Sequence, residues 1–475
     1  MTKTIENLGD PSVNFNPANA SICEDAPADL LIDFNTTYKP NYSKGVFMPK
    51  SYEWSISGTG VTASDYAFTG GTNASSAFPK IIFKAYKTFA INVKVNGECN
   101  GNNEATFNLT LKETPVITNS NLTQSICSGT STSAISLTSS VSGTTFTWEV
   151  IKSANITTVI NGNSNTSAST IPAITINNNS TTSGTVTYRV TPIANGCTGS
   201  SKDFVITVNP TPFISNISET ICSGYTFSKT PTDGNGNIIP SGTKYSWGTP
   251  VSNPTGAITG GSAQTNVSSI SQTLTNITNT AATLTYTITP QSGTSGSCAG
   301  QPFTVIITVK PTPILTQPDN QTICNNLLTS AILFSSNVAN TTFTWTNTNP
   351  TIGLSASGNG NIGSFKAINT GTTNQTATIT VTPTANGCSG TARSFTITVN
   401  PTPQFSKQPE SSSVCINGSA KTLSVAFANG TGTPSYQWFS NTTNSNTGGT
   451  EISGAINDSY APTTNVVGTT YYYCV

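Results

Sequence analysis

Ten cysteines carry the most readily assigned chemistry in this sequence of 475 residues, because their spacing divides them into five successive pairs. One tryptophan lies between the two cysteines of each pair, and these five units include every cysteine and every tryptophan of the chain. The pairs are Cys23 and Cys99, Cys127 and Cys197, Cys222 and Cys298, Cys324 and Cys388, and Cys415 and Cys474; the tryptophans are Trp54, Trp148, Trp247, Trp345 and Trp438. This spacing, in a chain with only two methionines, predicts a disulfide framework made in an oxidising compartment.

The connectivity of these disulfides has two main interpretations. The first is one bond within each unit, which would close a loop of roughly 60–75 residues and stabilise it by about 4 kcal/mol. The second is a bond between neighbouring units, for example Cys127 to Cys298. In an immunoglobulin-like topology the first cysteine lies near the bottom of its domain and the second near the top, ~20 Å apart along a six-residue strand, whereas a disulfide needs Cα atoms within ~7 Å. Either the strand order differs from that topology or the bonds connect adjacent domains; free or metal-bound thiols are a third interpretation.

Several kinds of catalytic chemistry are excluded by composition. Histidine is absent, which excludes Ser-His-Asp and Cys-His mechanisms as well as zinc or haem bound through histidine. Carboxylate pairs for glycoside hydrolysis are too few in the later units, and the units share no carboxylate position. We therefore predict that the protein is not an enzyme.

The charge and hydropathy patterns limit the partners. The 19 basic side chains balance 19 acidic ones, and only Arg189 and Arg393 are arginines, so we expect no nucleic-acid partner. No run of ~18 apolar residues exists, so we expect no membrane insertion. The first residues contain no apolar signal-peptide core, which, with the cysteine framework, suggests a piece of a longer secreted protein.

One group of carboxylates could hold a metal ion. Glu24, Asp25, Asp29 and Asp33 follow or flank Cys23 within eleven residues of each other. Oxygen ligands of this kind suit Ca²⁺. The competing interpretation is a solvated acidic loop, and no other cofactor is indicated.

The elements that must position these residues are strands. The segment 145–150 (TFTWEV) alternates inward Phe146 and Trp148 with outward threonine, and 51–56, 244–249, 342–347 and 435–440 repeat the aromatic-x-Trp step. A second alternating strand is predicted over 186–192, 284–290 and 376–383, and a returning strand over 203–210, 303–311 and 394–401. Between them, Asn195-Gly196 and Asn386-Gly387 predict type I′ turns. No window has sustained helical periodicity, and each tryptophan is predicted to lie in a sandwich core.

Recurrent proline-rich segments mark the joins between the units. They read VNPTPF (208–213), VKPTPI (309–314), VNPTPQ (399–404) and, more weakly, KETPVI (112–117). The predicted domains are 1–114, which is divergent and more charged; 115–212; 213–312; 313–402; and 403–475, an immunoglobulin-like subtype expected to be truncated before its last strand. The fold class is thus all-β, a tandem array of antiparallel β-sandwich domains forming an elongated rod.

The motifs TICSG, FTW, VTYxVTPxANGCTG and ITVNPTP resemble the PKD-like and immunoglobulin-like repeats of large Bacteroidetes cell-surface adhesins, including the gliding-motility adhesins of flavobacteria. The resemblance extends over nearly the whole chain and is strongest over 115–402. It implies a secreted protein on the bacterial cell surface, exported by the type IX system. It also implies neighbouring domains of a larger surface protein, a surface polysaccharide, or secretion and motility machinery as partners.

The leading functional hypothesis is a non-catalytic stalk segment of an adhesin that spans distance and bears tension. At roughly 35–40 Å per sandwich, the rod would be ~200 Å long. One alternative is a set of glycan-binding accessory modules of a secreted enzyme, for which Tyr225, Phe227 and Tyr460 are the loop aromatics available. Another is a subunit of a self-assembling surface filament, in which a donated strand completes the last domain.

Overall fold

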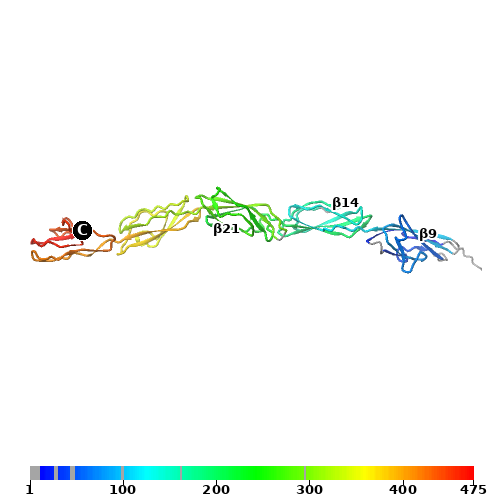
Figure 1. The fold of residues 1–475 in the computed structure, drawn as a ribbon, viewed down its shortest axis with the longest axis horizontal. Helices are drawn as coiled ribbons and strands as arrows, with labels where there is room; N and C mark the ends of the chain where they lie inside the picture. The colour runs from blue at the N-terminus through cyan, green and yellow to red at the C-terminus, as the bar shows by residue number, and fades with distance from the viewer. Residues whose placement is uncertain (1–10, 26–29, 43–48, 98–100, 161–162, 294–295) are drawn as a thin grey trace, which may run out of the picture.

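The computed structural model describes residues 11–25, 30–42, 49–97, 101–160, 163–293 and 296–475. Five hydrophobic clusters follow one another along the chain, within residues 13–111, 117–208, 214–309, 315–399 and 423–474. Figure 1 shows the corresponding five bodies arranged end to end in one elongated array. We number the domains one to five after these clusters, and the joints between them one to four. The protein is therefore a tandem array of β-sandwich domains.

Strands make up almost all of the regular structure. The described residues contain no α-helix, and their one 3-10 helix is η2 (Pro350–Ile352) in the fourth domain. No helix in the described parts of the chain is long and apolar enough to cross a membrane.

The second, third and fourth domains share the order of their main sheets. In each, the first strand lies beside the last, followed by the penultimate strand, the tryptophan strand and a further edge strand: β10-β19-β17-β13-β14, β20-β28-β27-β22-β25 and β29-β34-β32-β30-β31. The second domain comprises β10 (Thr123–Cys127), β11 (Thr130–Ser131), β12 (Ile135–Ser136), β13 (Thr145–Lys152), β14 (Asn163–Ala168), β15 (Thr170–Ile171), β16 (Thr175–Ile176), β17 (Gly184–Ala194), β18 (Cys197–Thr198) and β19 (Lys202–Asn209). The third comprises β20 (Ile217–Cys222), β21 (Tyr225–Lys229), β22 (Lys244–Trp247), β23 (Val251–Asn253), β24 (Ile258–Thr259), β25 (Gln264–Val267), β26 (Ile270–Asn276), β27 (Ala282–Gln291) and β28 (Phe303–Lys310). The fourth comprises β29 (Gln321–Cys324), β30 (Thr342–Asn347), β31 (Ser357–Asn359), β32 (Gln375–Ala385), β33 (Cys388–Ser389) and β34 (Arg393–Asn400).

The first domain has the same central order, β2-β9-β8-β5, with a three-stranded sheet β3-β7-β6 and the pair β1-β4. Its strands are β1 (Val13–Asn14), β2 (Asn19–Glu24), β3 (Leu30–Asp33), β4 (Asn41–Tyr42), β5 (Ser51–Ser57), β6 (Tyr66–Thr69), β7 (Lys80–Phe83), β8 (Thr88–Asn96) and β9 (Asn102–Glu113). Its core is aromatic: the rings of Phe34 and Trp54 lie 5.0 Å apart, and Phe15 contacts both.

The fifth domain is built differently. It has the pairs β35-β37 and β36-β40 and the three-stranded sheet β39-β38-β41. Its strands are β35 (Gln404–Lys407), β36 (Leu423–Ser424), β37 (Ala426–Ala428), β38 (Trp438–Asn441), β39 (Thr450–Glu451), β40 (Ser459–Tyr460) and β41 (Tyr471–Cys474).

Alternation along the strands explains the sandwich. In β17, Val186, Tyr188 and Val190 are buried while the residues between them face outward. The outward threonines pair across strands, as Thr376 and Thr398 do with hydroxyls 3.1 Å apart. Threonine keeps the β-branched geometry that strands favour while its hydroxyl stays hydrated. The composition with few charges is thus what a two-sheet sandwich with polar, uncharged outer faces requires.

One strand pair in each of the first four domains departs from the antiparallel expectation. The first strand runs parallel to the last: β2 with β9, β10 with β19, β20 with β28 and β29 with β34. Because the last strand leads out of the domain, the end of a first strand parallel to it also lies at the exit of the domain. This strand direction decides where the first cysteine of each of the first four units lies.

Candidate functional site: the joints between domains

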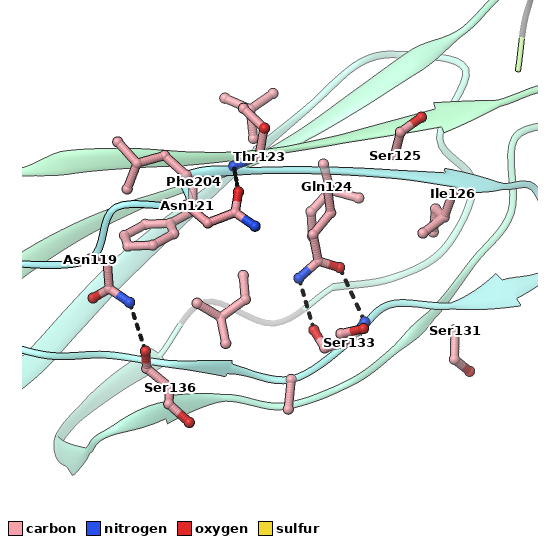
Figure 2. Close-up of a pocket in the computed structure, with 15 residues that line it drawn as sticks. Asn119, Asn121, Thr123, Gln124, Ser125, Ile126, Ser131, Ser133, Ser136 and Phe204 are labelled. Atoms are coloured by element: carbon pink, nitrogen blue, oxygen red, sulfur yellow. Dashed lines mark hydrogen bonds between the residues drawn. The ribbon is translucent and has the colours of Figure 1, made fainter.

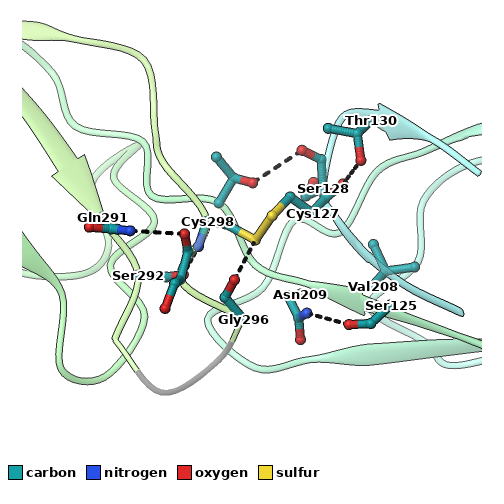
Figure 3. Close-up of a disulfide and its surroundings, with 12 residues drawn as sticks. Ser125, Cys127, Ser128, Thr130, Val208, Asn209, Gln291, Ser292, Gly296 and Cys298 are labelled. Atoms are coloured by element: carbon teal, nitrogen blue, oxygen red, sulfur yellow. Dashed lines mark hydrogen bonds between the residues drawn. A yellow bond between two sulfur atoms is a disulfide. The ribbon is translucent and has the colours of Figure 1, made fainter.

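Three disulfides connect neighbouring domains. Cys23 is bonded to Cys197, Cys127 to Cys298, and Cys222 to Cys388, and the Cα atoms of each bonded pair are 5.6 Å apart. Figure 3 shows the second of these bonds between the strands of the second domain and the hairpin of the third. In every case, the first cysteine of one domain bonds the second cysteine of the next.

The strand directions explain this connectivity. Cys127 ends β10 opposite Asn209, at the exit of the second domain. Cys298 follows the turn between β27 and β28, and β28 starts at the entrance of the third domain. The interpretation of one bond within each unit is therefore wrong for these six cysteines. The two cysteines of a unit do lie at opposite ends of their domain, but the first is at the exit and the second at the entrance, the reverse of the expected placement.

Two of the hairpins that carry a second cysteine, those of the second and fourth domains, have the predicted turns. Asn195 and Gly196 have φ of 53° and 80°, and Asn386 and Gly387 have φ of 53° and 81°. Positive φ at both central residues defines the type I′ turn, so this prediction is confirmed. The cross-strand pairs on either side of the turns, Ala194 with Cys197 and Ala385 with Cys388, fix the cysteines at the hairpin ends.

The linker is packed against the same hairpins. Two residues after the second cysteine of the second, third and fourth domains comes a glycine, and a Cβ there would overlap a backbone carbonyl oxygen of the linker. The overlaps are Gly199 with Pro115, Gly300 with Pro212, and Gly390 with Pro313. The recurrent Cys-x-Gly therefore has two roles. The cysteine forms the disulfide with the preceding domain, and the glycine leaves space for the linker backbone, which a side chain would block.

At the third joint, the last strand of the third domain also reaches across to the fourth. Lys310 pairs in register with Cys222, and its Nζ donates to the carbonyl oxygen of Asn386 in the next hairpin at 2.9 Å. On the exit side of the same joint, Thr312 Oγ1 donates to the carbonyl oxygen of Ser223 at 3.1 Å, as Thr211 does to Ser128 in the second domain, so the start of each linker is held to the domain it leaves. Peptide, disulfide and hydrogen bonds thus fix neighbouring domains at more than one point.

A buried asparagine closes the exit end of the second, third and fourth domains, and it was not foreseen from the sequence. Asn276 Nδ2 donates to the carbonyl oxygens of Thr280 and Val309 at 2.7 and 2.8 Å, and its Oδ1 accepts from the Thr278 N–H at 2.8 Å. Asn178 and Asn369 make the corresponding bonds in their domains. The signal was available, because each asparagine lies eight residues before a buried residue of the penultimate strand: Asn178 before Val186, Asn276 before Leu284 and Asn369 before Ala377.

The fourth joint lacks a disulfide. Cys324 ends β29 opposite Asn400, as Cys222 ends β20 opposite Lys310, but Cys324 is exposed and unbonded. Contact across this joint includes Asn400 Nδ2, which donates to Thr431 Oγ1 at 3.0 Å. Cys415 and Cys474 are also unbonded, and burial raises the pKa of the Cys474 thiol. Cys99, the remaining cysteine, lies outside the described residues.

All five tryptophans are buried, with Trp148 the most accessible at 9% and Trp438 the least at 0%. The indole N–H groups of Trp54, Trp247 and Trp438 each donate to a backbone carbonyl, those of Ser76, Ser262 and Asn457. Trp345 Nε1 is buried without such a partner. These rings fill the space between sheets and are not available for stacking on a ligand.

The acidic group near Cys23 is divided between two sheets. Glu24 ends β2, whereas Asp33 ends β3 of the other sheet, and Asp29 lies outside the described residues. Asp25 lies just beyond β2, where its backbone carbonyl accepts from Tyr86 Oη at 3.0 Å. Asp33 accepts the N–H of Asn35 and forms an ion pair with Lys80 at 3.1 Å, and these contacts, in that order, lower the pKa of its carboxyl. The described residues contain no cluster of three or more metal-binding side chains, and Asp33 is already paired within the protein.

A polar groove of about 440 Å³ runs along the second domain between β10 and the segment 131–136. Figure 2 shows that its amides are bonded to the protein: Gln124 exchanges hydrogen bonds with the backbone of Ser133, both at 3.1 Å, and Asn119 donates to the carbonyl oxygen of Ser136. Gln321 bonds Ser330 in the same way in the fourth domain. In the third domain the corresponding residue is Glu219, which pairs with Lys229 at 3.2 Å. The groove therefore lies between two sheets of the second domain, and hydrogen bonds from amide side chains connect these sheets across it.

Of the three aromatics considered for glycan stacking, one is exposed. Phe227 is in the core at 1% exposure, and Tyr460 packs on Trp438 with ring centroids 6.2 Å apart. Tyr225 is 65% exposed and lies in a hollow of about 320 Å³ at the third joint, beside Lys310 and Asn386.

The fold and the joints define a tandem array of β-sandwich domains covalently connected from one domain to the next. The chain belongs to the family of PKD-like domains, whose model matches residues 124–212, 219–313 and 321–403, together more than half of the sequence.

Several solved arrays of immunoglobulin or cadherin domains are similar to this chain at low identity. The N-terminal eight Ig domains of the Down syndrome cell adhesion molecule are 11% identical, with a TM-score of 0.30 over 94% of this chain. The match covers 55% of that structure, so this chain spans about half of its length. The human desmocollin-1 ectodomain is 10% identical over 96% of this chain and 97% of its own, with a TM-score of 0.23. An I-band fragment of titin is 9% identical over 64% of this chain and all of its own, with a TM-score of 0.33. No curated protein sequence matches this chain.

Proposed function

We propose that this chain is a non-catalytic spacer, a stalk segment of a secreted bacterial cell-surface adhesin that holds a distal part of the protein away from the cell and bears tension. The observation that carries the proposal is that three successive joints are each connected twice, by a peptide linker and by a disulfide. A second covalent connection between domains limits bending and separation, which a spacer needs and a globular catalyst does not.

The chemistry of the bonds supports an extracellular location. Disulfides persist in oxidising environments such as the bacterial cell surface and are rare in the cytosol. The resemblance of the repeats to those of Bacteroidetes adhesins supports attachment as the role, with export by type IX secretion and gliding motility as its further implications. The predicted domain boundaries, 1–114, 115–212, 213–312, 313–402 and 403–475, are part of this proposal.

Small-angle X-ray scattering on the purified chain tests the spacer. We expect the scattering of a rod with a maximum dimension of ~200 Å, from five sandwiches of roughly 35–40 Å each. A compact particle of half that dimension would refute the proposal. Antibody labelling of intact cells that make the full-length protein tests the location, and labelling seen only after lysis would contradict it.

Glycan binding remains a second candidate, because Tyr225 presents an exposed ring beside polar groups at the third joint. Loss of binding to a polysaccharide array on Tyr225→Ala, with Tyr436→Ala as the control at a ring in the fifth domain, would support it. An array on which the unmodified chain binds nothing would dismiss it.

A further inference from the structure

We propose that tension along the array is carried by the first and last strands of the domains and by the three disulfides, so that the first four domains cannot lengthen even when their cores unfold. The biological load rests on the proposed spacer function, whereas the route of the force follows from the connectivity alone.

The shortest covalent route through the array uses two of the three bonds. It enters along β2 to Cys23, crosses to Cys197, follows residues 197–222 through the second joint, and crosses from Cys222 to Cys388. The two crossings bypass sequence separations of 174 and 166 residues. A force applied to the two ends therefore tightens this route first and leaves the bypassed segments slack.

The route is already extended in the folded protein. Residues 197–222 contain β19, of eight residues, and β20, of six, joined by the proline-rich linker. Strands rise about 3.3 Å per residue, and a fully extended chain reaches only ~3.3–3.6 Å per residue. Almost no further length is available along this route.

A second route runs beside the first. It follows β10 to Cys127, crosses to Cys298 and continues along β28 toward β29. The two routes are neighbours in the parallel pairs β10 with β19 and β20 with β28. Each of the first three joints is crossed by one route through the linker and by the other through the disulfide. Because force acts along the paired strands, it loads their hydrogen bonds together rather than one after another.

The rest of each domain is attached to these routes but carries no force. One such segment, residues 128–196 with Trp148, lies between Cys127 and Cys197. Another, residues 223–297 with Trp247, lies between Cys222 and Cys298. Unfolding of such a segment opens a loop without moving its two ends apart along the array.

The fifth domain provides an internal contrast. Cys324 is unbonded, so force passes from the fourth to the fifth domain through the peptide chain alone. The fifth domain should therefore lengthen when it unfolds, in the same molecule and under the same force.

Single-molecule stretching of the full chain, with handles attached by peptide ligation at both ends, tests the proposal. With the bonds intact we expect one lengthening step of roughly 200 Å, from the fifth domain, and none from the other four. After reduction with a phosphine we expect four further steps of roughly 300 Å each. The variant C222S/C388S, which removes the bond of the third joint, should lengthen under oxidising conditions by an additional amount on the order of 400 Å, whereas C324S should behave as the unmodified chain.

Steps of about 300 Å from the first four domains without reductant would overturn the proposal, as would peptide mapping that finds Cys127 bonded to Cys197. If the double variant does not fold, the lengthening of the unmodified chain with and without reductant still tests the proposal. Scattering separates this inference from the spacer function: a ~200 Å rod that lengthens freely contradicts only the inference, and a compact particle that does not lengthen contradicts only the function.

Discussion

The third and fourth joints have nearly the same structure on the side of the domain that the chain leaves, and they differ on the side of the domain that it enters. On the exit side, Cys222 lies opposite Lys310 and Cys324 lies opposite Asn400, each at the end of a parallel strand pair. On the entrance side, the fourth domain presents the hairpin with Cys388 and Gly390, whereas the fifth presents a loop with Gly430 and Thr431. The exit ends of the third and fourth domains are therefore built alike, and the entrance of the next domain decides whether a disulfide forms across the joint.

Removing the bond of the third joint should have the largest effect on this comparison. The bond closes a sequence separation of 166 residues, so the chain-entropy model gives a loss of about 5 kcal/mol in C222S/C388S. Urea unfolding followed by hydrogen exchange in individual peptides should place the loss in the third and fourth domains. Cys324→Ser is the matched control and should change nothing; an equal loss there would mean that the fourth joint depends on its cysteine as well.

The buried asparagines test whether the exits of the third and fourth domains are equivalent. Asn276→Ala and Asn369→Ala each remove two hydrogen bonds donated to backbone carbonyls and one accepted from a backbone N–H, so we expect about 3 kcal/mol of destabilisation for each domain. The exposed Asn374 supplies the control, with no change expected in Asn374→Ala. A loss confined to one of the two domains would show that their exits differ in more than the bond.

A pair of glycine variants tests the entrances. A Cβ on Gly390 would overlap the Pro313 carbonyl oxygen, whereas a Cβ on Gly430 would be 3.3 Å from Pro403 Cγ. Gly390→Ala should therefore destabilise the fourth domain by about 1–3 kcal/mol, and Gly430→Ala should cost the fifth less than about 0.5 kcal/mol. Thermal unfolding measures both. Equal costs would mean that the linker fits both entrances alike.

Acid should produce the smallest effect and should leave the joints unchanged. The Lys87 ammonium and the backbone and hydroxyl of Thr62 lower the pKa of Asp65 in the first domain to about 2. Because this value lies below that of the unfolded chain, the contribution of Asp65 to stability is present above about pH 4 and is lost as the pH falls toward 2. Unfolding of the first domain as a function of pH should show this loss, and Asp65→Asn should remove it. Separation of the bridged joints at pH 3 would contradict the expectation, since disulfides do not titrate.

The sequence predicted most of what is local. Alternation around Trp148 and Trp345 predicted the strands, the Asn-Gly pairs predicted the turns, and the proline-rich segments indicated the joins. The asparagine at the domain exit was missed because asparagine is abundant in this chain, and its role depends on a cavity formed by residues distant in sequence, such as Val309 for Asn276.

The pairing of the cysteines was left open for a physical reason. The order of the six bonded cysteines along the sequence is compatible with bonds within a unit and with bonds between units. The choice depends on whether the first strand of a domain runs parallel or antiparallel to its last strand. That direction leaves no mark in the periodicity of Ile217–Cys222, because both kinds of pairing place alternate residues on the same face.

The sequence by itself determined that the chain would be a series of sandwich domains with five buried tryptophans and no histidine chemistry, because periodicity and composition are properties of each segment alone. Only the tertiary structure decided that Cys127 meets Cys298 and that Cys324 meets no partner within the described chain, because a disulfide depends on which strand ends lie within about 7 Å of each other.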